Sequence, residues 1–311
     1  MLAKPRRNMT LIAGFRCRDG LILCADTQET ISGYTKLNTD KIRGLMYTGG
    51  CINVAGAGDA DLIEMAVDRL VDHFLLDDCQ VTDWRRTQRE IEGVLVPLFE
   101  DQARRNSFLP SEERPWSDLL IAYRAEDGKE LLKISGTKVR RVRAAQCLGT
   151  GMILANSLVS ELFDQNMTMK QAGLLAIYAV FRAKRYVDGV GGNTDILFIG
   201  DYGLTRIPTS DVQRIESWWL ELEQSGISLA RALTATEGID KNAVATLADF
   251  KDTLAFYDEI YKEVDAVLNP TTKPEAGMMV TKILHIDGRR FFQSEGGAKR
   301  PASRNKKVDQ Q

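Results

Sequence analysis

The spacing of apolar residues alternates along this chain between the two-residue period of strands and the 3.6-residue period of helices. Short strand patterns occupy about residues 10–55, 119–145 and 194–207, with a pair of helical patterns after each of the first two groups and a further helical pattern over 208–224. A loop rich in Thr, Ser and Gly is expected over 27–39, and a single strand over 138–145. Turns such as Arg18-Asp19-Gly20 join neighbouring strands, so the sheets are expected to be antiparallel. Because every helix has one apolar face to bury, this order predicts an α+β fold, a four-layer αββα sandwich of two antiparallel sheets flanked by helix pairs.

The composition is that of an ordinary globular chain. Among 311 residues, 44% are hydrophobic and 27% charged, and the net charge is -2. The segment before Thr10 has no apolar run of signal-peptide length, and the longest apolar run, at 173–181, is too short to cross a bilayer. We therefore expect a cytoplasmic protein with no membrane and no nucleic-acid partner.

The cysteines and histidines argue against metal or disulfide chemistry. Five scattered cysteines contain no CxxC pair, and only two histidines are present. An odd cysteine number without a leader is typical of reduced, buried thiols. No cofactor and no metal site are expected.

The segment from Thr10 to Thr27 carries the most informative spacing. Thr10 begins an apolar strand, Gly20 follows at the hairpin, and Asp26 ends the next strand. This pattern resembles the opening of proteasome β-type subunits and their bacterial HslV-type relatives, which are N-terminal-nucleophile (Ntn) hydrolases. The family's catalytic lysine falls on Lys41 if one loop residue is deleted, and on Ile42 without a gap. Lys41 is preferred, because α-type subunits of the family also show a Lys-Ile pair here.

Three later motifs strengthen the resemblance, which covers about residues 10–220. Residues 54–61 resemble the family's turn before its first helix, and 147–151 resemble its Gly-Ser-Gly turn with Thr150 in place of Ser. Residues 188–193 resemble its Asp-x-x-Ser-Gly-Gly loop with Gly191 in place of Ser. Each motif alone is weak, but their order along the chain is specific.

The resemblance implies a threonine peptidase that hydrolyses peptide bonds. A threonine hydroxyl needs a base to remove its proton, and in this family the base is the residue's own α-amine. A neighbouring ammonium lowers the pKa of that amine by like-charge repulsion. The implied roles are Thr10 as nucleophile, Lys41 beside its amine, Asp26 orienting Lys41, Thr150 and Asp188 supporting the amine, Gly56 as oxyanion donor, Thr30 pairing with the substrate backbone and Val54 near the specificity pocket.

Each residue also has a structural interpretation. Thr10 suits the start of an edge strand, and Asp26 with Lys41 suits an ion pair inherited by an inactive relative. Gly56 suits a tight turn, Thr150 a helix N-cap and Asp188 a solvated loop.

The mechanism requires a free amine on Thr10, which Met9 precedes. Removal of one methionine from a start at Met9, autocatalytic removal of residues 1–9, or retention of the prefix are the three routes. The last would make a non-catalytic ring subunit, and an Ntn amidase on small amides is a further alternative. Self-association into rings and a partner ATPase are expected from the resemblance only.

The predicted organisation has three parts. Residues 1–9 are a prefix, 10–225 the proteasome-type Ntn hydrolase domain, and 226–311 a C-terminal extension. In the extension a helix is expected over 240–268, a strand over 278–286 and then a basic, disordered tail.

Overall fold

The computed structural model describes residues 10–31, 35–47, 50–76, 83–111, 113–201, 203–234 and 262. All of the described residues belong to one compact unit of the chain, which spans residues 1–271. The prefix 1–9, the predicted strand over 278–286 and the basic tail lie outside the described residues, as does the predicted helix over 240–268 apart from Lys262.

The first sheet has the strand order β10-β1-β2-β11-β12, and its neighbours are antiparallel. A hydrogen bond of 2.8 Å from Cys17 N to Gly20 O closes the turn between its first two strands. Apart from their last residues, Arg16 and Asp26, those strands are apolar, as expected of strands with both faces covered. The strands are β1 (Leu11–Arg16), β2 (Leu21–Asp26), β10 (Ala145–Gly149), β11 (Thr194–Ile199) and β12 (Leu204–Arg206).

The second sheet has the order β5-β6-β7-β8-β9 and is also antiparallel. Its strands are β5 (Ile42–Tyr47), β6 (Gly50–Gly58), β7 (Ser117–Ala125), β8 (Gly128–Ser135) and β9 (Lys138–Arg141). A separate hairpin of β3 (Gln28–Ile31) and β4 (Thr35–Asn38) follows β2. This hairpin replaces the loop that the sequence suggested over 27–39.

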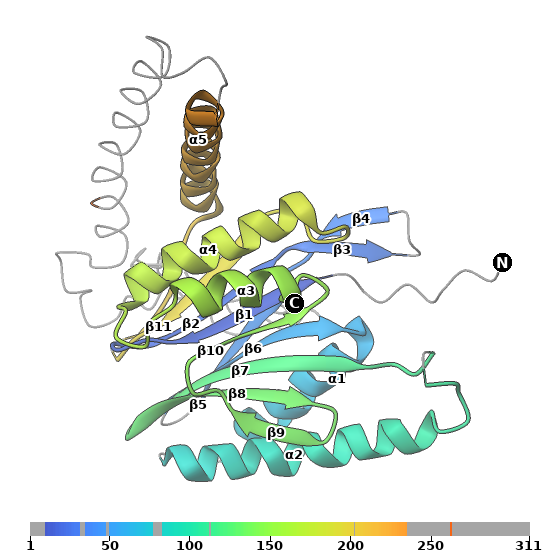
Figure 1. Ribbon diagram of the computed structural model, residues 1–311. Coiled ribbons are helices and arrows are strands. Elements are labelled where there is room, and N and C mark those ends of the chain that lie inside the picture. Colours follow the sequence, from blue (N-terminus) through green and yellow to red (C-terminus); the bar gives the residue numbers. More distant parts are fainter. Residues whose placement is uncertain are drawn as a thin grey trace, which may run out of the picture. The chain divides into compact units, whose positions relative to one another are not determined.

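Helices cover the outer face of each sheet (Figure 1). The helices are α1 (Ala60–Val71), continued by the π-helical turn η1 (Asp72–Leu76), α2 (Trp84–Arg105), α3 (Met152–Leu162), α4 (Met169–Tyr186) and α5 (Thr209–Thr234). Buried apolar residues form three layers: one under α3 and α4, one between the sheets, and one under α1 and α2. The four-layer αββα prediction is thereby confirmed.

The chain crosses from one sheet to the other where a single strand was predicted over 138–145. The structure has β9 in the second sheet, a short connection, and β10 in the first sheet. Val142 is buried at this crossing, and its N–H donates to Leu131 O at 2.8 Å. The apolar pattern continues through the crossing, so periodicity alone did not reveal it.

Helix α5 runs to Thr234, beyond the helix end at 224 that the pattern suggested, and the predicted domain boundary at residue 225 falls inside it. Its first turns pack against α4 and β11 through buried Val212, Ile215 and Trp218. None of the described helices is both long and apolar enough for a membrane span.

Candidate active site

Thr10 stands at the entrance to β1, beside the last residue of β2. The register pairs Ile12 with Ala25, which brings Asp26 next to the start of β1. Thr10 is 4% exposed and Asp26 is fully buried. Asp26 Oδ1 accepts hydrogen bonds of 2.8 Å from both Thr10 Oγ1 and Leu11 N.

Lys41 completes a three-residue cluster from a different part of the chain. Its ammonium donates to Thr10 Oγ1, to Asp26 Oδ1 at 2.8 Å and to Gln28 O at 2.6 Å. Ile42, the ungapped alternative, is instead 1% exposed in the layer between the sheets. The structure thus places Lys41, not Ile42, beside Thr10.

The cluster has the electrostatics that an activated hydroxyl needs. Burial lowers the pKa of Lys41, and the Asp26 carboxylate opposes that shift. A cation in hydrogen-bond contact with a hydroxyl oxygen stabilises negative charge that develops there. Thr10 Oγ1 therefore lies between a carboxylate that accepts its proton in a hydrogen bond and an ammonium that favours its deprotonated form.

The second oxygen of Asp26 is held by the loop before β11. Gly191 N donates to Asp26 Oδ2 at 3.1 Å, and Gly191 O accepts from Gln28 N at 3.0 Å. Asn193 and Thr27 exchange two more hydrogen bonds, of 2.9 and 2.8 Å. The loop thus fixes both Asp26 and the backbone whose carbonyl accepts from Lys41.

Helix α5 anchors this loop in turn. Glu216 accepts from Lys184 Nζ at 2.6 Å and from Thr194 Oγ1 at 2.5 Å, and both side chains of the ion pair are largely buried. Gln213 Nε2 donates to Asn193 Oδ1 at 3.0 Å. These supports could not be predicted from the sequence, because a carboxylate and an amide on an amphipathic helix carry no signal that they face a site.

The turn between β10 and α3 holds the backbone of Thr10. Gly149 has φ +92°, and a Cβ there would collide with the Thr10 carbonyl oxygen. Gly151 N donates to the same oxygen at 3.4 Å. The Gly-Thr-Gly motif thus contributes through its glycines.

Gly56 lies in β6, close to the segment that carries Lys41. Ile42 of β5 pairs with Ala55 of β6, so the pairing of these two strands ends one residue before Gly56. On its other side, Gly56 pairs with Leu119 of β7. A Cβ on Gly56 would lie 2.6 Å from the Ile63 side chain in α1. Glycine is therefore required for helix packing, and the register brings its backbone beside the Lys41 segment.

The structure does not bring Thr150 and Asp188 to Thr10. Both residues are exposed, and within the described part of the chain neither side chain hydrogen-bonds to Thr10. Thr150 does not cap α3 either, since Gly151 is the N-cap and no side chain caps that helix.

Thr30 and Val54, the two residues predicted to contact substrate, lie in different parts of the fold. Thr30 lies in β3, in register with Lys36 of β4. Val54 is 2% exposed and packs in the apolar layer under α1 and α2. The pocket role of Val54 stays a prediction.

Four cysteines of the described chain are buried free thiols, while Cys79 lies outside it. Burial raises the pKa of Cys17 and of Cys147 to about 12. Such thiols are protonated and weakly nucleophilic at neutral pH. Among the described residues, no group of three or more His, Cys, Asp or Glu side chains is arranged to hold a metal ion.

Comparison with known sequences shows weak similarity to proteasome β subunits. No family model matches the chain. The "Proteasome subunit beta" of Methanosarcina thermophila is 23% identical over 207 residues, covering 66% of this chain and 92% of that protein. That of Methanosarcina barkeri is 21% identical over 211 residues, covering 67% and 94%.

Solved structures of Anbu proteins share the fold. Anbu, described as an ancestral beta-subunit, from Yersinia bercovieri aligns with a TM-score of 0.59 at 12% identity, over 70% of this chain and 96% of that one. The helical assembly of the Anbu complex from Pseudomonas aeruginosa gives 0.60 at 13% identity, over 70% and 95%. The chain therefore has the fold of these Anbu proteins.

Proposed function

We propose that this chain is a proteasome-like threonine peptidase subunit that hydrolyses peptide bonds through Thr10. The observation that supports this most is the contact of the Thr10 hydroxyl with both Asp26 and Lys41. The three residues are far apart in sequence, and the carboxylate and ammonium also contact each other at 2.8 Å. A buried ion pair aimed at one hydroxyl is typical of an activated nucleophile.

In the proposed reaction Thr10 Oγ1 attacks the peptide carbonyl after residues 1–9 have been removed. The freed α-amine of Thr10 takes the hydroxyl proton and passes it to the leaving amine, so an acyl ester forms on Oγ1 as the peptide C–N bond breaks. Water then hydrolyses the ester. Lys41 stabilises the charge on Oγ1, and the N–H of Gly56 is proposed as a donor to the carbonyl oxyanion.

The remaining assignments complete the proposal. Thr150 and Asp188 match the family's motif positions, but neither side chain hydrogen-bonds to Thr10 in the described chain. We propose that they act on the amine only once it is free. Thr30 would pair with the peptide backbone along β3. The similarity to proteasome β subunits and to the Anbu helical assembly supports self-association. A cytoplasmic location and a partner ATPase are further proposals.

The decisive experiment is the intact mass and N-terminal sequence of the purified protein, with labelling by a peptide epoxyketone. The proposal expects a chain that begins at Thr10 and gains one label, and a Thr10→Ala variant that gains none. A chain that keeps residues 1–9 and is not labelled by the epoxyketone contradicts the proposal.

A silent structural subunit is the second candidate, favoured by the burial of Thr10 and the exposure of Thr150 and Asp188. It predicts the same assembly with an intact prefix. Electron microscopy of the unlabelled protein, together with the mass measurement, separates the two candidates.

A further inference from the structure

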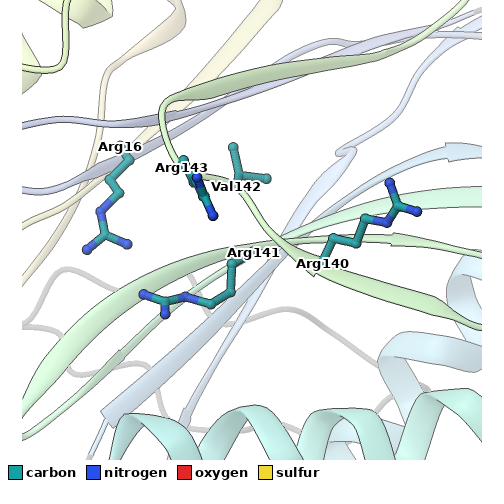
Figure 2. A pocket seen from close by; sticks show the side chains of 5 residues that line it. All are labelled: Arg16, Arg140, Arg141, Val142 and Arg143. Carbon is teal, nitrogen blue, oxygen red and sulfur yellow. The ribbon is translucent and has the colours of Figure 1, made fainter.

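Four arginines line a hollow of about 460 Å³ at the end of β1 opposite Thr10 (Figure 2). Arg16 ends β1 in the first sheet, Arg140 and Arg141 end β9 in the second, and Arg143 lies in the connection to β10. With about 3.3 Å per strand residue, β1 separates this hollow from Thr10 by roughly 20 Å. It is therefore distinct from the candidate active site.

The positive charge of this arginine hollow exceeds the negative charge that contacts it. Glu130, 3% exposed, accepts from Arg16 Nη1 at 2.5 Å and from Arg141 Nε and Nη2 at 2.8 and 2.6 Å. Arg140 and Arg143 are exposed, and they form no ion pair with any described residue. Of the four arginines that line the hollow, two therefore contact the Glu130 carboxylate and two have no ion pair with a described residue.

The contacts of Glu130 also fix the direction of two guanidinium groups. The Arg141 Cζ lies 4.6 Å from the centre of the Trp84 ring, while Nε and Nη2 donate to Glu130. In Figure 2, Arg16, Arg141 and Arg143 extend on the same side of the β9–β10 connection, whereas the guanidinium of Arg140 points away. Such pre-orientation lowers the entropy cost of binding a ligand.

Protection of an exposed sheet edge does not explain this set. Charged side chains on an edge strand commonly block pairing with other strands, and β9 is an edge strand. Arg16 belongs to the other sheet, however, and Arg143 lies beyond the end of β9. Convergence of arginines from two sheets on one hollow is typical of a ligand site.

We propose that the arginine hollow binds a small multivalent oxyanion. Guanidinium forks match the oxygen pairs of phosphates and carboxylates, and each arginine here keeps N–H donors that Glu130 does not use. A ligand with several negative charges would neutralise the excess that Glu130 leaves. Phosphate and carboxylate groups supply the same chemistry, and the proposal does not depend on the peptidase function.

The test is isothermal titration calorimetry of the full-length protein with inorganic tripolyphosphate and, separately, with citrate. We expect saturable binding of one anion per chain, and the better of the two probes identifies the class. Arg143→Gln should weaken binding by roughly tenfold or more, since one charge-assisted contact is lost. Arg16→Gln should do the same while Glu130 keeps its two bonds from Arg141.

A matched control is Arg89→Gln, which removes one exposed arginine of α2 outside the hollow. It should bind like the original protein. The proposal is overturned if neither tripolyphosphate nor citrate binds. It is also overturned if Arg89→Gln and Arg143→Gln weaken binding equally, because that would show nonspecific electrostatic attraction. Binding of a single-stranded oligonucleotide but of neither small anion also overturns it.

Discussion

The two ends of β1 handle charge in opposite ways. At the start, the buried Asp26 carboxylate meets one ammonium, one hydroxyl and two backbone N–H groups, so every nearby donor has an acceptor. At the end, the buried Glu130 carboxylate meets two guanidinium groups, while Arg140 and Arg143 add positive charge without a described acid.

The difference shows how one strand can serve two purposes. A buried, balanced cluster is rigid and fixes the position of a reacting atom, because moving any member leaves an unpaired group in a low dielectric. An unbalanced, open cluster retains attraction for something outside the chain. We therefore expect substitutions at the Thr10 end to change activity and stability, and those at the Arg16 end to change ligand affinity.

Among the substitutions at the two ends of β1, Thr10→Ala should have the largest effect on peptide hydrolysis. Removing the nucleophile should lower peptide hydrolysis by at least about 10³-fold, while the unfolding transition changes little. Hydrolysis of a fluorogenic peptide and urea unfolding measure the two effects. Thr137→Ala, at an exposed position in the turn between β8 and β9, is the matched threonine control. A Thr10→Ala protein with undiminished hydrolysis would place the nucleophile elsewhere.

Asp26→Asn should test whether the Thr10 end is a balanced cluster. The Lys41 ammonium would remain largely buried without its carboxylate, which costs about 3–5 kcal/mol in the free energy of unfolding. Urea unfolding at neutral pH measures it, and Asp26→Asn combined with Lys41→Met should recover part of the loss. Asp101→Asn, in an exposed pair with Arg104, is the control; equal losses in both variants would contradict the prediction.

Asp195 in β11 pairs with Ala25, next to Asp26, and is a buried carboxylate whose charge is incompletely compensated. Burial raises the pKa of Asp195 to about 6 despite Arg206, and its Oδ2 has no hydrogen bond in the described chain. Because the folded-state pKa exceeds the unfolded value near 4, the folded state binds more protons between about pH 4 and 6. Asp195 therefore costs stability above pH 6 and nothing below pH 4.

Asp195→Asn should accordingly raise the free energy of unfolding by up to about 3 kcal/mol at pH 8, with the gain fading towards pH 4. Denaturant unfolding at several pH values measures this change. A gain that does not vary with pH would show that the effect comes from packing rather than from ionisation.

Gln213→Ala should have the smallest effect, since it removes one hydrogen bond between α5 and Asn193. The free energy of unfolding should fall by about 1 kcal/mol or less, while kcat falls a few-fold through looser placement of Asp26 and KM stays constant. Steady-state kinetics measure it. Ser217→Ala is the control, since the Ser217 hydroxyl donates to Gln213 O within α5 and to no other described residue. An unchanged kcat in Gln213→Ala would show that α5 does not influence the reaction.

Local pattern predicted most of the fold because each element carries its own signal. The strand run Leu21 to Cys24 and the cap Asp59, which accepts from Leu62 N at 2.9 Å, could be identified directly. The crossing at Val142 could not, because a buried residue between two sheets has the same apolar character as one inside a strand. The hairpin of β3 and β4 was missed because polar residues dominate both strands.

The sequence by itself determined the layer order and the residue types at Thr10, Asp26 and Lys41, because periodicity and motif spacing are local properties. The resemblance already favoured Lys41 over Ile42, and the structure brings Lys41 into contact with Thr10. Tertiary structure alone decided that Glu216 supports the loop behind Asp26 and that arginines from two sheets meet at one hollow. These are contacts between distant segments, and sheet register and layer packing, which no single segment encodes, bring them together.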